Sequence, residues 1–312
     1  MKETNKKKNN LNEKTAGKIT APMKVLRFMA SAVLKKYNPR VIVITGSIGK
    51  TSSKDAIFAV LSGRFRVRKS EKNYNNEIGV PLTIIGAESG GKSLLKWWLI
   101  FLKWLGLIIF PIKYSEILIL EMGADRPGDL KYLTDFVHPH IAVLTEVSSS
   151  HLEYFKNVEA ILKEKVTILK ALDEKGLAII NTDNPHIAKL KDASRQNGVR
   201  ARIFSFGFSE TADARAMEVF LNYDGENNMM EKNLNGLSFK LNYKGTTMPM
   251  RLNNILARHN IYAALAGVSV GIELGMNLVE IGASLENFSL PAGRMNLIKG
   301  IKNTFIIDDT YN

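Results

Sequence analysis

Residues 46–51 read GSIGKT and combine two glycines with a lysine and a threonine directly after an apolar run. Gly46 and Gly49 permit backbone angles at which several N–H groups point into one concavity, and a helix that starts there presents its positive end to an anion. Lys50 would then contact the β- and γ-phosphates of a nucleotide, and the Thr51 hydroxyl would bind magnesium. Because the spacing is shorter than in the common phosphate loop, the alternative is a glycine turn with a solvated lysine.

The composition limits the kinds of site that the chain can contain. It has 312 residues, 45% of them apolar, and no cysteine, which excludes disulfides and thiolate sites and fits a reducing cytoplasm. The formal charge is +13, and the first twenty residues hold six Lys against two Glu, which predicts a disordered basic tail over residues 1–20. No basic stripe interleaved with aromatic residues is present, so no nucleic-acid partner is expected.

The apolar pattern predicts an α/β fold, with a mostly parallel sheet covered by helices on both faces. From about residue 203 to 251 the pattern changes to short alternating segments, with turn signals at Asp224-Gly225 and Asn235-Gly236, which predicts antiparallel strands at the edge of the sheet. A final strand over Thr304–Asp308 would begin a new unit. The other predicted strands are Val41–Thr45, Ile117–Leu120, Ile141–Leu144 and Leu177–Ile180, and the predicted helices are Pro22–Lys36, Lys50–Leu61, Val158–Leu172 and 258–287.

A series of short motifs, in one order along the chain, resembles the Mur ligases, which join amino acids or peptides to the peptidoglycan precursor. After the phosphate loop come NYNNEIGVP (73–81), EMGA (121–124), HLEYF (151–155), NTDN (181–184), RHN (258–260), GR (293–294) and DDTYN (308–312). Within the family, DDTYN and the stretch ADRPGDL (124–130) point to the ligases that add D-alanyl-D-alanine. The expected partners are therefore a peptidoglycan precursor peptide and D-alanyl-D-alanine.

The resemblance implies an ATP-dependent reaction in which a carboxylate becomes an acyl phosphate that an amine then attacks. Both steps gather negative charge, so cations and oriented donors would carry catalysis. Two Mg²⁺ ions are implied, the first held by Thr51 and the second by Glu121 and His151. Lys165 would be carbamylated beside the second ion; it fits the family register better than Lys163, and the alternative is that both lysines are solvated. The implied catalytic residues are Lys50, Glu121, His151 and Lys165.

The resemblance also implies contacts to the nucleotide and to the acceptor. Several of these contacts have an alternative interpretation. His259 and Asn260, and likewise Asn75 and Asn76, could cap helices, and Arg294 and Asp309 could be surface charges at a domain hinge. The implied ATP-binding residues are Gly46, Ser47, Gly49, Lys50, Thr51, Ser52, Asn181, His259, Asn260, Arg294 and Asp309, and the implied substrate-binding residues are Asn73, Asn75 and Asn76.

The resemblance predicts a central ATP-binding domain over residues 21–292 and the start of a carboxy-terminal ligase domain over 293–312, in a chain that is a fragment or a reduced form. About forty residues precede the phosphate loop, too few for the uridine-binding domain usual in the family. Two alternatives therefore stay open. One is a ligase acting on another acceptor, such as a folylpolyglutamate or a lipid-linked muropeptide. The other is an inactive nucleotide-binding interaction module.

Residues 94–110 are unusually apolar and, within a predicted insertion over 92–113, hold all three tryptophans. As a helix they would span roughly 25 Å, which is marginal for crossing a bilayer. A crossing would also separate the phosphate loop from Glu121, although both belong to one site. Lys96 and Lys103 share one helical face, which favours a helix lying in a membrane interface, at the inner face of the plasma membrane. The alternative is an insertion packed on the protein's own sheet or on a partner.

Overall fold

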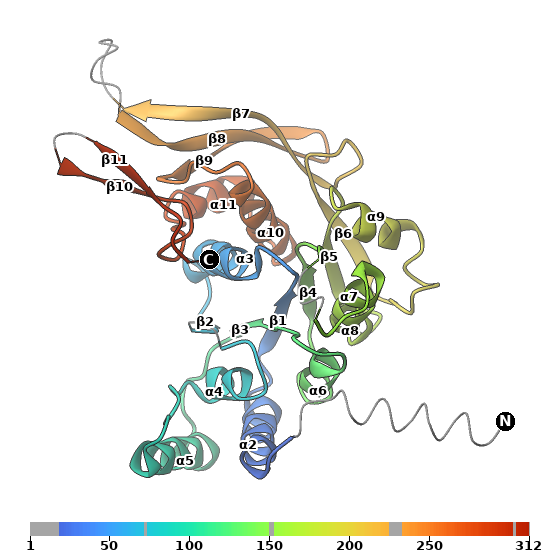
Figure 1. The fold of residues 1–312 in the computed structure, drawn as a ribbon, viewed down its shortest axis with the longest axis vertical. Helices are drawn as coiled ribbons and strands as arrows, with labels where there is room; N and C mark the ends of the chain where they lie inside the picture. The colour runs from blue at the N-terminus through green and yellow to red at the C-terminus, as the bar shows by residue number, and fades with distance from the viewer. Residues whose placement is uncertain (1–18, 72–73, 150–152, 225–232, 302–303, 312) are drawn as a thin grey trace.

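The computed structural model describes residues 19–71, 74–149, 153–224, 233–301 and 304–311. Nine of the strands in these ranges form one sheet in the order β2-β3-β1-β4-β5-β6-β7-β8-β9 (Figure 1). Neighbours from β2 to β7 are parallel, and β7, β8 and β9 are antiparallel. The strands are β1 (Arg40–Thr45), β2 (Val67–Lys69), β3 (Ile117–Glu121), β4 (Ile141–Leu144), β5 (Leu177–Asn181), β6 (Arg202–Gly207), β7 (Ala214–Asp224), β8 (Asn233–Tyr243) and β9 (Thr246–Asn253).

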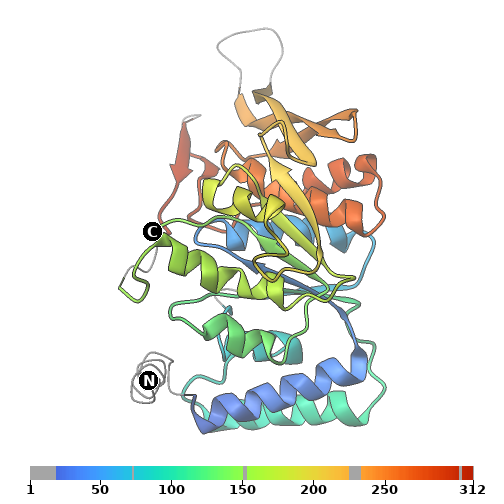
Figure 2. The ribbon, with the colours of Figure 1, turned by 90° about the vertical axis from the view of Figure 1, so that its right-hand side faces the viewer.

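Helices cover both faces of the sheet, as the apolar strands require. Side chains along β1 alternate between two cores: Val41 and Val43 join one, and Ile42 and Ile44 join the other. The first core is covered by α2 (Ala21–Tyr37), α4 (Gly79–Ile85), α5 (Leu94–Ile109), α6 (Asp129–Thr134), α7 (Val158–Lys165), α8 (Thr167–Lys170) and α9 (Pro185–Asp192). The second is covered by α3 (Lys50–Ser62), α10 (Asn260–Glu273) and α11 (Leu278–Leu285), and Figure 2 shows the two layers on opposite sides of the sheet.

The predicted α/β fold is confirmed, with corrections in its detail. The antiparallel part does not start at residue 203, because β6 pairs in parallel with β5 and the first antiparallel pair is β7 with β8. Asn235-Gly236 is not a turn; it lies inside β8, where Gly236 is the residue that fits because an added Cβ would lie 2.1 Å from the Leu252 carbonyl oxygen.

Two predicted helices are each divided in two. The segment 158–172 is split into α7 and α8 at Val166, and the segment 258–287 is split into α10 and α11 by a turn at Gly275, whose φ is +75°. The elements that the sequence did not predict, β2, α4, α6, α9 and β10, are short, so their periodicity is weak.

The predicted strand near the chain end is present as β11 (Phe305–Asp308), paired antiparallel with β10 (Asn296–Lys299). This hairpin is a sheet of its own (Figure 1), joined to the main body by a bridge between Ile255 and Asn296. Nearly all of the predicted basic tail lies outside the described residues.

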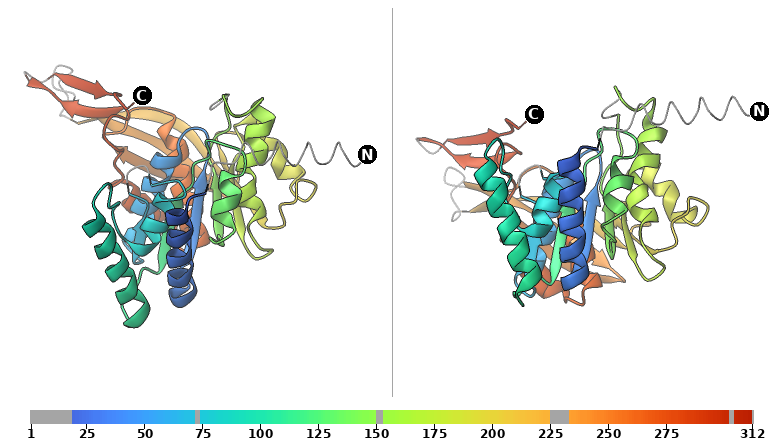
Figure 3. Two further views of the ribbon diagram at one scale, coloured as in Figure 1. Left: turned by 60° about the horizontal axis from the view of Figure 1, so that its bottom comes forward. Right: turned by 90° about the horizontal axis from the view of Figure 1, so that it is seen from below.

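The tryptophan-rich segment forms α5, which packs along α2 and α4 at the outer edge of the first layer (Figure 3). Among the described helices, none is long and apolar enough to cross a membrane.

Candidate active site at the phosphate loop

The loop between β1 and α3 is fitted closely to the end of β4. A Cβ added to Gly46 would lie 2.0 Å from the Thr145 hydroxyl, and Gly49 has φ +84°. The Ser47 N–H donates to the Glu146 carbonyl at 2.7 Å. The loop is therefore a tightly held turn in which only glycine fits at residue 46, as a phosphate cradle requires.

Lys50, the first residue of α3, is folded back over this loop. Its Nζ donates to the carbonyl oxygens of Gly46, at 2.7 Å, and Ser47, at 3.1 Å. Burial lowers the pKa of Lys50; the charge of Glu121 raises it, and the charge of Arg294 lowers it. The ammonium thus lies within electrostatic reach of a carboxylate and a guanidinium, and it is not the solvated lysine of a plain glycine turn.

Glu121 ends β3, directly beside Ile44 of β1, and its side chain is buried. One oxygen, Oε1, accepts from Asn75 Nδ2 at 3.1 Å. The other, Oε2, is buried without a hydrogen-bond partner, and Lys54 Nζ lies 3.9 Å away. A buried carboxylate oxygen without a donor fits a hard divalent cation, for which oxygen is the preferred ligand.

Lys165 lies in the last turn of α7 and is buried. With its ordinary pKa, a lysine side chain would carry a charge at neutral pH. Burial lowers its pKa to about 7, the charge of Lys50 acts in the same direction, and Glu164 and Asp125 oppose it. Lys163, two residues earlier, is exposed. Lys163 and Lys165 were the two candidates for a lysine beside the second ion, and of the two only Lys165 faces the site.

Two of the side chains described above line one cavity of about 730 Å³. Lys50 and Lys165 line it together with Asn75, Asn76 and Asp125, and Glu121 is bonded to the Asn75 amide. Asn76 also has the structural role that the sequence left open, because its Oδ1 accepts from the N–H groups of Ile78 and Gly79 at the start of α4. Asn75 makes no such cap among the described contacts, and it positions Glu121.

A second cavity, of about 870 Å³, lies on the other side of the start of α3. Thr51, Lys54 and Arg294 line it. The Arg294 guanidinium lies over the Tyr311 ring at 4.0 Å, and its buried Nε has no hydrogen-bond partner in the described part of the chain. Lys50 and Thr51, neighbours at the start of α3, therefore line different cavities, Lys50 the first and Thr51 the second.

Four of the predicted nucleotide contacts, all outside the phosphate loop and α3, line neither cavity. Asn181, at the end of β5, is buried and accepts from the Asp183 N–H. His259 is exposed just before α10, and Asn260 is buried with an unpartnered Nδ2. Asp309, at the chain end, is exposed and lines neither hollow. Ser52 is buried in the first turn of α3.

Asp183, which the sequence did not indicate as a site residue, links the end of β5 to the loop after β6 and to α10. Asp183 accepts from the N–H groups of Phe208 and Ser209, at 2.6 and 2.9 Å, and from the Tyr262 hydroxyl at 2.9 Å, which links β5 to α10. Burial and this carboxylate raise the pKa of Tyr262 far above its ordinary value. Its neighbour Asn184 caps α9 and donates to the Val147 carbonyl. The hydrogen bonds of the NTDN motif therefore fix the position of the end of β5.

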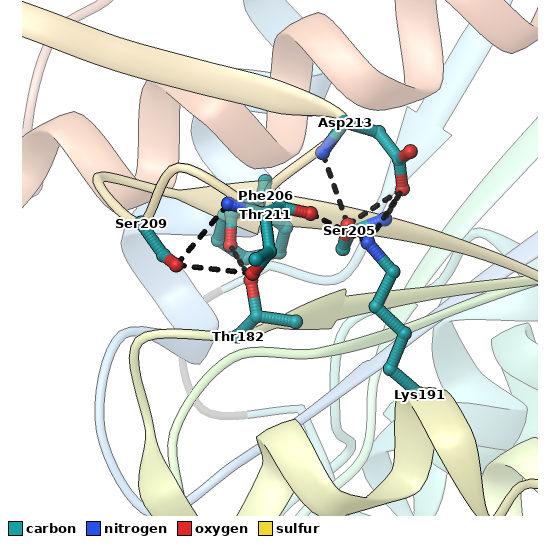
Figure 4. Close-up of polar contacts among 7 residues, drawn as sticks. All are labelled: Thr182, Lys191, Ser205, Phe206, Ser209, Thr211 and Asp213. Carbon is teal, nitrogen blue, oxygen red and sulfur yellow. Dashed lines mark hydrogen bonds and ion pairs between the residues drawn. The ribbon is translucent and has the colours of Figure 1, made fainter.

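The loop after β6 that holds Ser209 is itself fixed by a polar network (Figure 4). Lys191 donates to the Ser205 hydroxyl at 2.9 Å and to the Thr211 carbonyl, and Ser205 donates to Asp213. The Thr182 hydroxyl donates to the Phe206 carbonyl. Of its members only Thr182 lies in a motif, and the sequence did not indicate the network because the members lie on four separate segments.

Two predicted residues, His151 and Asn73, lie outside the described residues. Within the described ranges, no three His, Asp or Glu side chains are grouped closely enough to hold a metal ion. The structure also adds Lys54, which is buried between Asp55, at 3.8 Å, and Glu121. Its spacing, four residues after Lys50 on one helix, was a usable sequence signal.

Comparison with known proteins places the chain in a family. The family described as Mur ligase middle domain matches residues 105–271, more than half of the chain. The chain is 28% identical over 287 residues, 92% of its length, to the UDP-N-acetylmuramoyl-tripeptide--D-alanyl-D-alanine ligase of Bacillus subtilis, and 28% identical over 284 residues to that of Escherichia coli. These alignments cover 53% and 54% of the relatives.

Solved structures agree with these relatives. MurF from Acinetobacter baumannii has a TM-score of 0.73 at 25% identity, over 93% of this chain and 55% of that one. MurF ligase from Thermotoga maritima in complex with ADP has a TM-score of 0.73 at 26% identity, over 94% of this chain and 58% of that one. The chain spans about half the length of the relatives it matches. With the family match, the alignments and the shared fold in agreement, the chain belongs to the Mur ligase family.

Proposed function

We propose that this chain carries the ATP-binding part of a ligase that adds D-alanyl-D-alanine to a UDP-MurNAc-peptide. The observation that supports it most directly is the grouping of Lys50, Lys165 and Asn75 around one cavity, with Glu121 bonded to Asn75 and its second oxygen left without a hydrogen-bond donor. Such a grouping suits a reaction whose two steps both gather negative charge. The matched relatives carry the name of this activity.

In this proposal the loop and Lys50 bind the triphosphate. Lys50 now bonds two loop carbonyls, so a phosphate oxygen would take over a cation that is already positioned beside the loop. Arg294, near enough to influence the Lys50 pKa, would contact a phosphate from the second cavity. Asn181, His259, Asn260 and Asp309 remain proposed contacts to the rest of the nucleotide.

Thr51, Glu121, His151 and a carbamylated Lys165 are the proposed holders of two Mg²⁺ ions, which when bound would neutralise phosphate charge and polarise the acceptor carboxylate. Asn75 positions Glu121 through Oε1 and leaves Oε2 free to face a cation. The low pKa of Lys165 keeps a neutral amine available, as carbamylation needs. Asn73, Asn75 and Asn76 are the proposed contacts to the acceptor.

The domain limits from the sequence are part of the same proposal. Residues 21–292 would form the ATP-binding domain, and residues 293–312, with the β10–β11 hairpin, would belong to a carboxy-terminal ligase domain. We place the reaction in the cytoplasm, where ATP and nucleotide-linked precursors are available.

The test is phosphate release from MgATP in the presence of UDP-MurNAc-tripeptide and D-alanyl-D-alanine, with the product detected by mass spectrometry. The expected result is release that depends on both acceptor and amine, and its loss in Lys50→Met. Lys163→Met, an exposed lysine on α7, is the matched control and should retain activity.

Two other results would each overturn part of the proposal. Release stimulated by a folate or a lipid-linked muropeptide, and not by the nucleotide-linked peptide, would keep the chemistry and reject the acceptor. Tight nucleotide binding without release under any acceptor would favour an interaction module and reject the enzyme.

A further inference from the structure

The outer side of α5 and α2 is a broad apolar surface, here called the apolar face. Figure 3 shows the two helices side by side at one end of the molecule. Most large apolar residues of α5 point outward, and only Ile100 and Leu107 are fully buried. The exposed residues of the apolar face are Leu94, Leu95, Trp98, Leu99, Phe101, Leu102, Ile109 and Phe110 together with Val25 and Phe28 of α2.

An aromatic row makes the apolar face continuous across both helices. Phe28 of α2 contacts Trp104, Trp104 contacts Phe101, and Phe101 contacts Trp98, with ring centroids 6.2, 5.6 and 5.6 Å apart. A contiguous apolar surface of this kind marks an interaction site, whereas singly scattered apolar residues do not. Tryptophan, with its apolar ring and polar N–H, is typical of membrane interfaces.

The apolar face is held in place before any partner binds. Lys36 Nζ donates to the carbonyl oxygens of Leu107, Ile108 and Phe110, at 2.8, 2.9 and 2.7 Å. These bonds satisfy carbonyls at the end of α5, which lack partners within the helix. Trp104 Nε1 donates to the Met29 carbonyl at 3.0 Å. The helix pair is therefore a preformed platform, so docking requires no refolding.

The charge of the two helices selects between possible partners. They carry no Asp or Glu and have six basic residues: Lys24, Arg27, Lys35, Lys36, Lys96 and Lys103. Lys96 and Lys103 lie along one border of the apolar arc of α5, seven residues apart. A second copy of the chain would bring like charges together, whereas an anionic lipid surface would attract them.

We propose that the apolar face docks in the plane of a bilayer that contains anionic lipids, with its exposed apolar side chains in the interface and the exposed Lys24, Lys35 and Lys96 at the headgroups. Lys36 and Lys103 are already bonded to carbonyl oxygens and add their charge from there. This proposal is independent of the ligase reaction. Neither helix contributes the phosphate loop, and although Met23 of α2 lines the first cavity, none of the exposed residues of the apolar face lines either cavity.

The three tryptophans make the test direct, since Trp97, Trp98 and Trp104 all lie on α5 and are the protein's only tryptophans. With vesicles of phosphatidylglycerol and phosphatidylcholine, tryptophan emission should shift to the blue, be quenched by brominated lipid, and accompany flotation of the chain. Pure phosphatidylcholine vesicles, or high salt, should weaken binding about tenfold, because the lysine contribution is electrostatic.

The variant Leu95→Glu/Leu99→Glu should lose at least about tenfold in partitioning, because two exposed apolar groups no longer enter the interface. The control Phe220→Glu/Val279→Glu changes two equally exposed apolar residues on other elements and should bind as the wild type does. Circular dichroism of both variants should match the wild type, because all four positions are exposed.

The following results would overturn the proposal. One is no spectral shift and no flotation of the wild type with anionic vesicles. Another is equal binding by the Leu95→Glu/Leu99→Glu variant, or equal binding to uncharged lipid. A third is a wild-type dimer in sedimentation that this variant converts to a monomer without any vesicle binding, because a second copy would then cover the face.

Discussion

At the scale of single residues, the site is a set of buried charges that lack complete partners. Glu121 has one oxygen without a donor, Lys165 is buried beside Lys50, and Lys54 lies nearly 4 Å from both of its carboxylates. Burial of unpaired charge is costly, so folding alone does not favour this arrangement. It is the arrangement expected where bound cations and phosphates complete the pairing.

Lys165 should be carbamylated in solution when bicarbonate is present. Its amine is neutral above about pH 7, because burial lowers the pKa, and only the neutral amine adds CO₂. In ¹³C-bicarbonate, NMR should detect one carbamate signal at pH 8 that is lost toward pH 6, where the lysine is protonated. Lys165→Ala should remove the signal, and Lys163→Ala, at an exposed position, should keep it. A signal that survives Lys165→Ala would refute the assignment.

Lys54→Met should destabilise the protein by about 3 kcal/mol, because it leaves the buried Glu121 oxygen without its nearest cation. Urea denaturation measures the loss. The matched control is Lys131→Met, which breaks the exposed pair with Asp135 and should cost less than about 0.5 kcal/mol. Equal effects of the two changes would show that Lys54 does not balance the buried carboxylate.

Sequence patterns indicated some of these residues and not others, for a physical reason. Lys50 and Glu121 belong to local motifs and Lys165 fits the family register, and each ends a strand or lies on a helix whose position is fixed by the sheet. Asp183 stood in a motif, yet its role as the joint to Tyr262 depends on a contact 79 residues away. Contacts of that length are set by the packing of β6 and α10, which no local pattern describes.

At the scale of elements, the phosphate loop depends on the spacing between β1 and β4. Gly46→Ala would place its Cβ 2.0 Å from the Thr145 hydroxyl, so the loop must shift. The expected result is at least tenfold weaker MgADP binding, measured by calorimetry, because the loop N–H groups lose their alignment. Gly63→Ala, with nothing within 4 Å and φ −71°, should leave binding unchanged. Normal affinity of Gly46→Ala would mean that the loop does not cradle phosphate.

The elements that the sequence predicted well are those whose environment is uniform along their length. Strands β1, β3, β4 and β5 are buried on both faces and read as continuous apolar runs. Strand β6 is also buried over its last four residues. The sequence predicted it as antiparallel because it directly precedes the alternating segments that form β7, β8 and β9. Which strand β6 pairs with depends on the arrangement of the whole sheet, so the local sequence of β6 does not indicate it.

At the scale of the whole molecule, stability should fall from the centre of the sheet toward the β10–β11 hairpin. Strands β1, β3 and β4 lie between two cores, whereas Phe305, Ile306 and Ile307 of β11 are exposed and the hairpin is joined to the main body by the single bridge between Ile255 and Asn296 among the described residues. A two-stranded hairpin is marginal without packing. Native-state hydrogen exchange should therefore be slowest in the central strands and fastest in the hairpin.

Nucleotide binding should change this gradient at one place. Arg294 precedes β10 and lines the cavity beside Thr51, so a phosphate held there would tie the hairpin to the phosphate loop. Saturating MgADP should slow exchange at residues 293–299 and 305–308 by at least tenfold, while the control strands β8 and β9 keep their rates. Arg294→Ala should abolish that local slowing and leave protection of the loop around Lys50. If the hairpin exchanges equally fast with and without nucleotide, Arg294 does not hold a phosphate, and the hairpin takes no part in binding it.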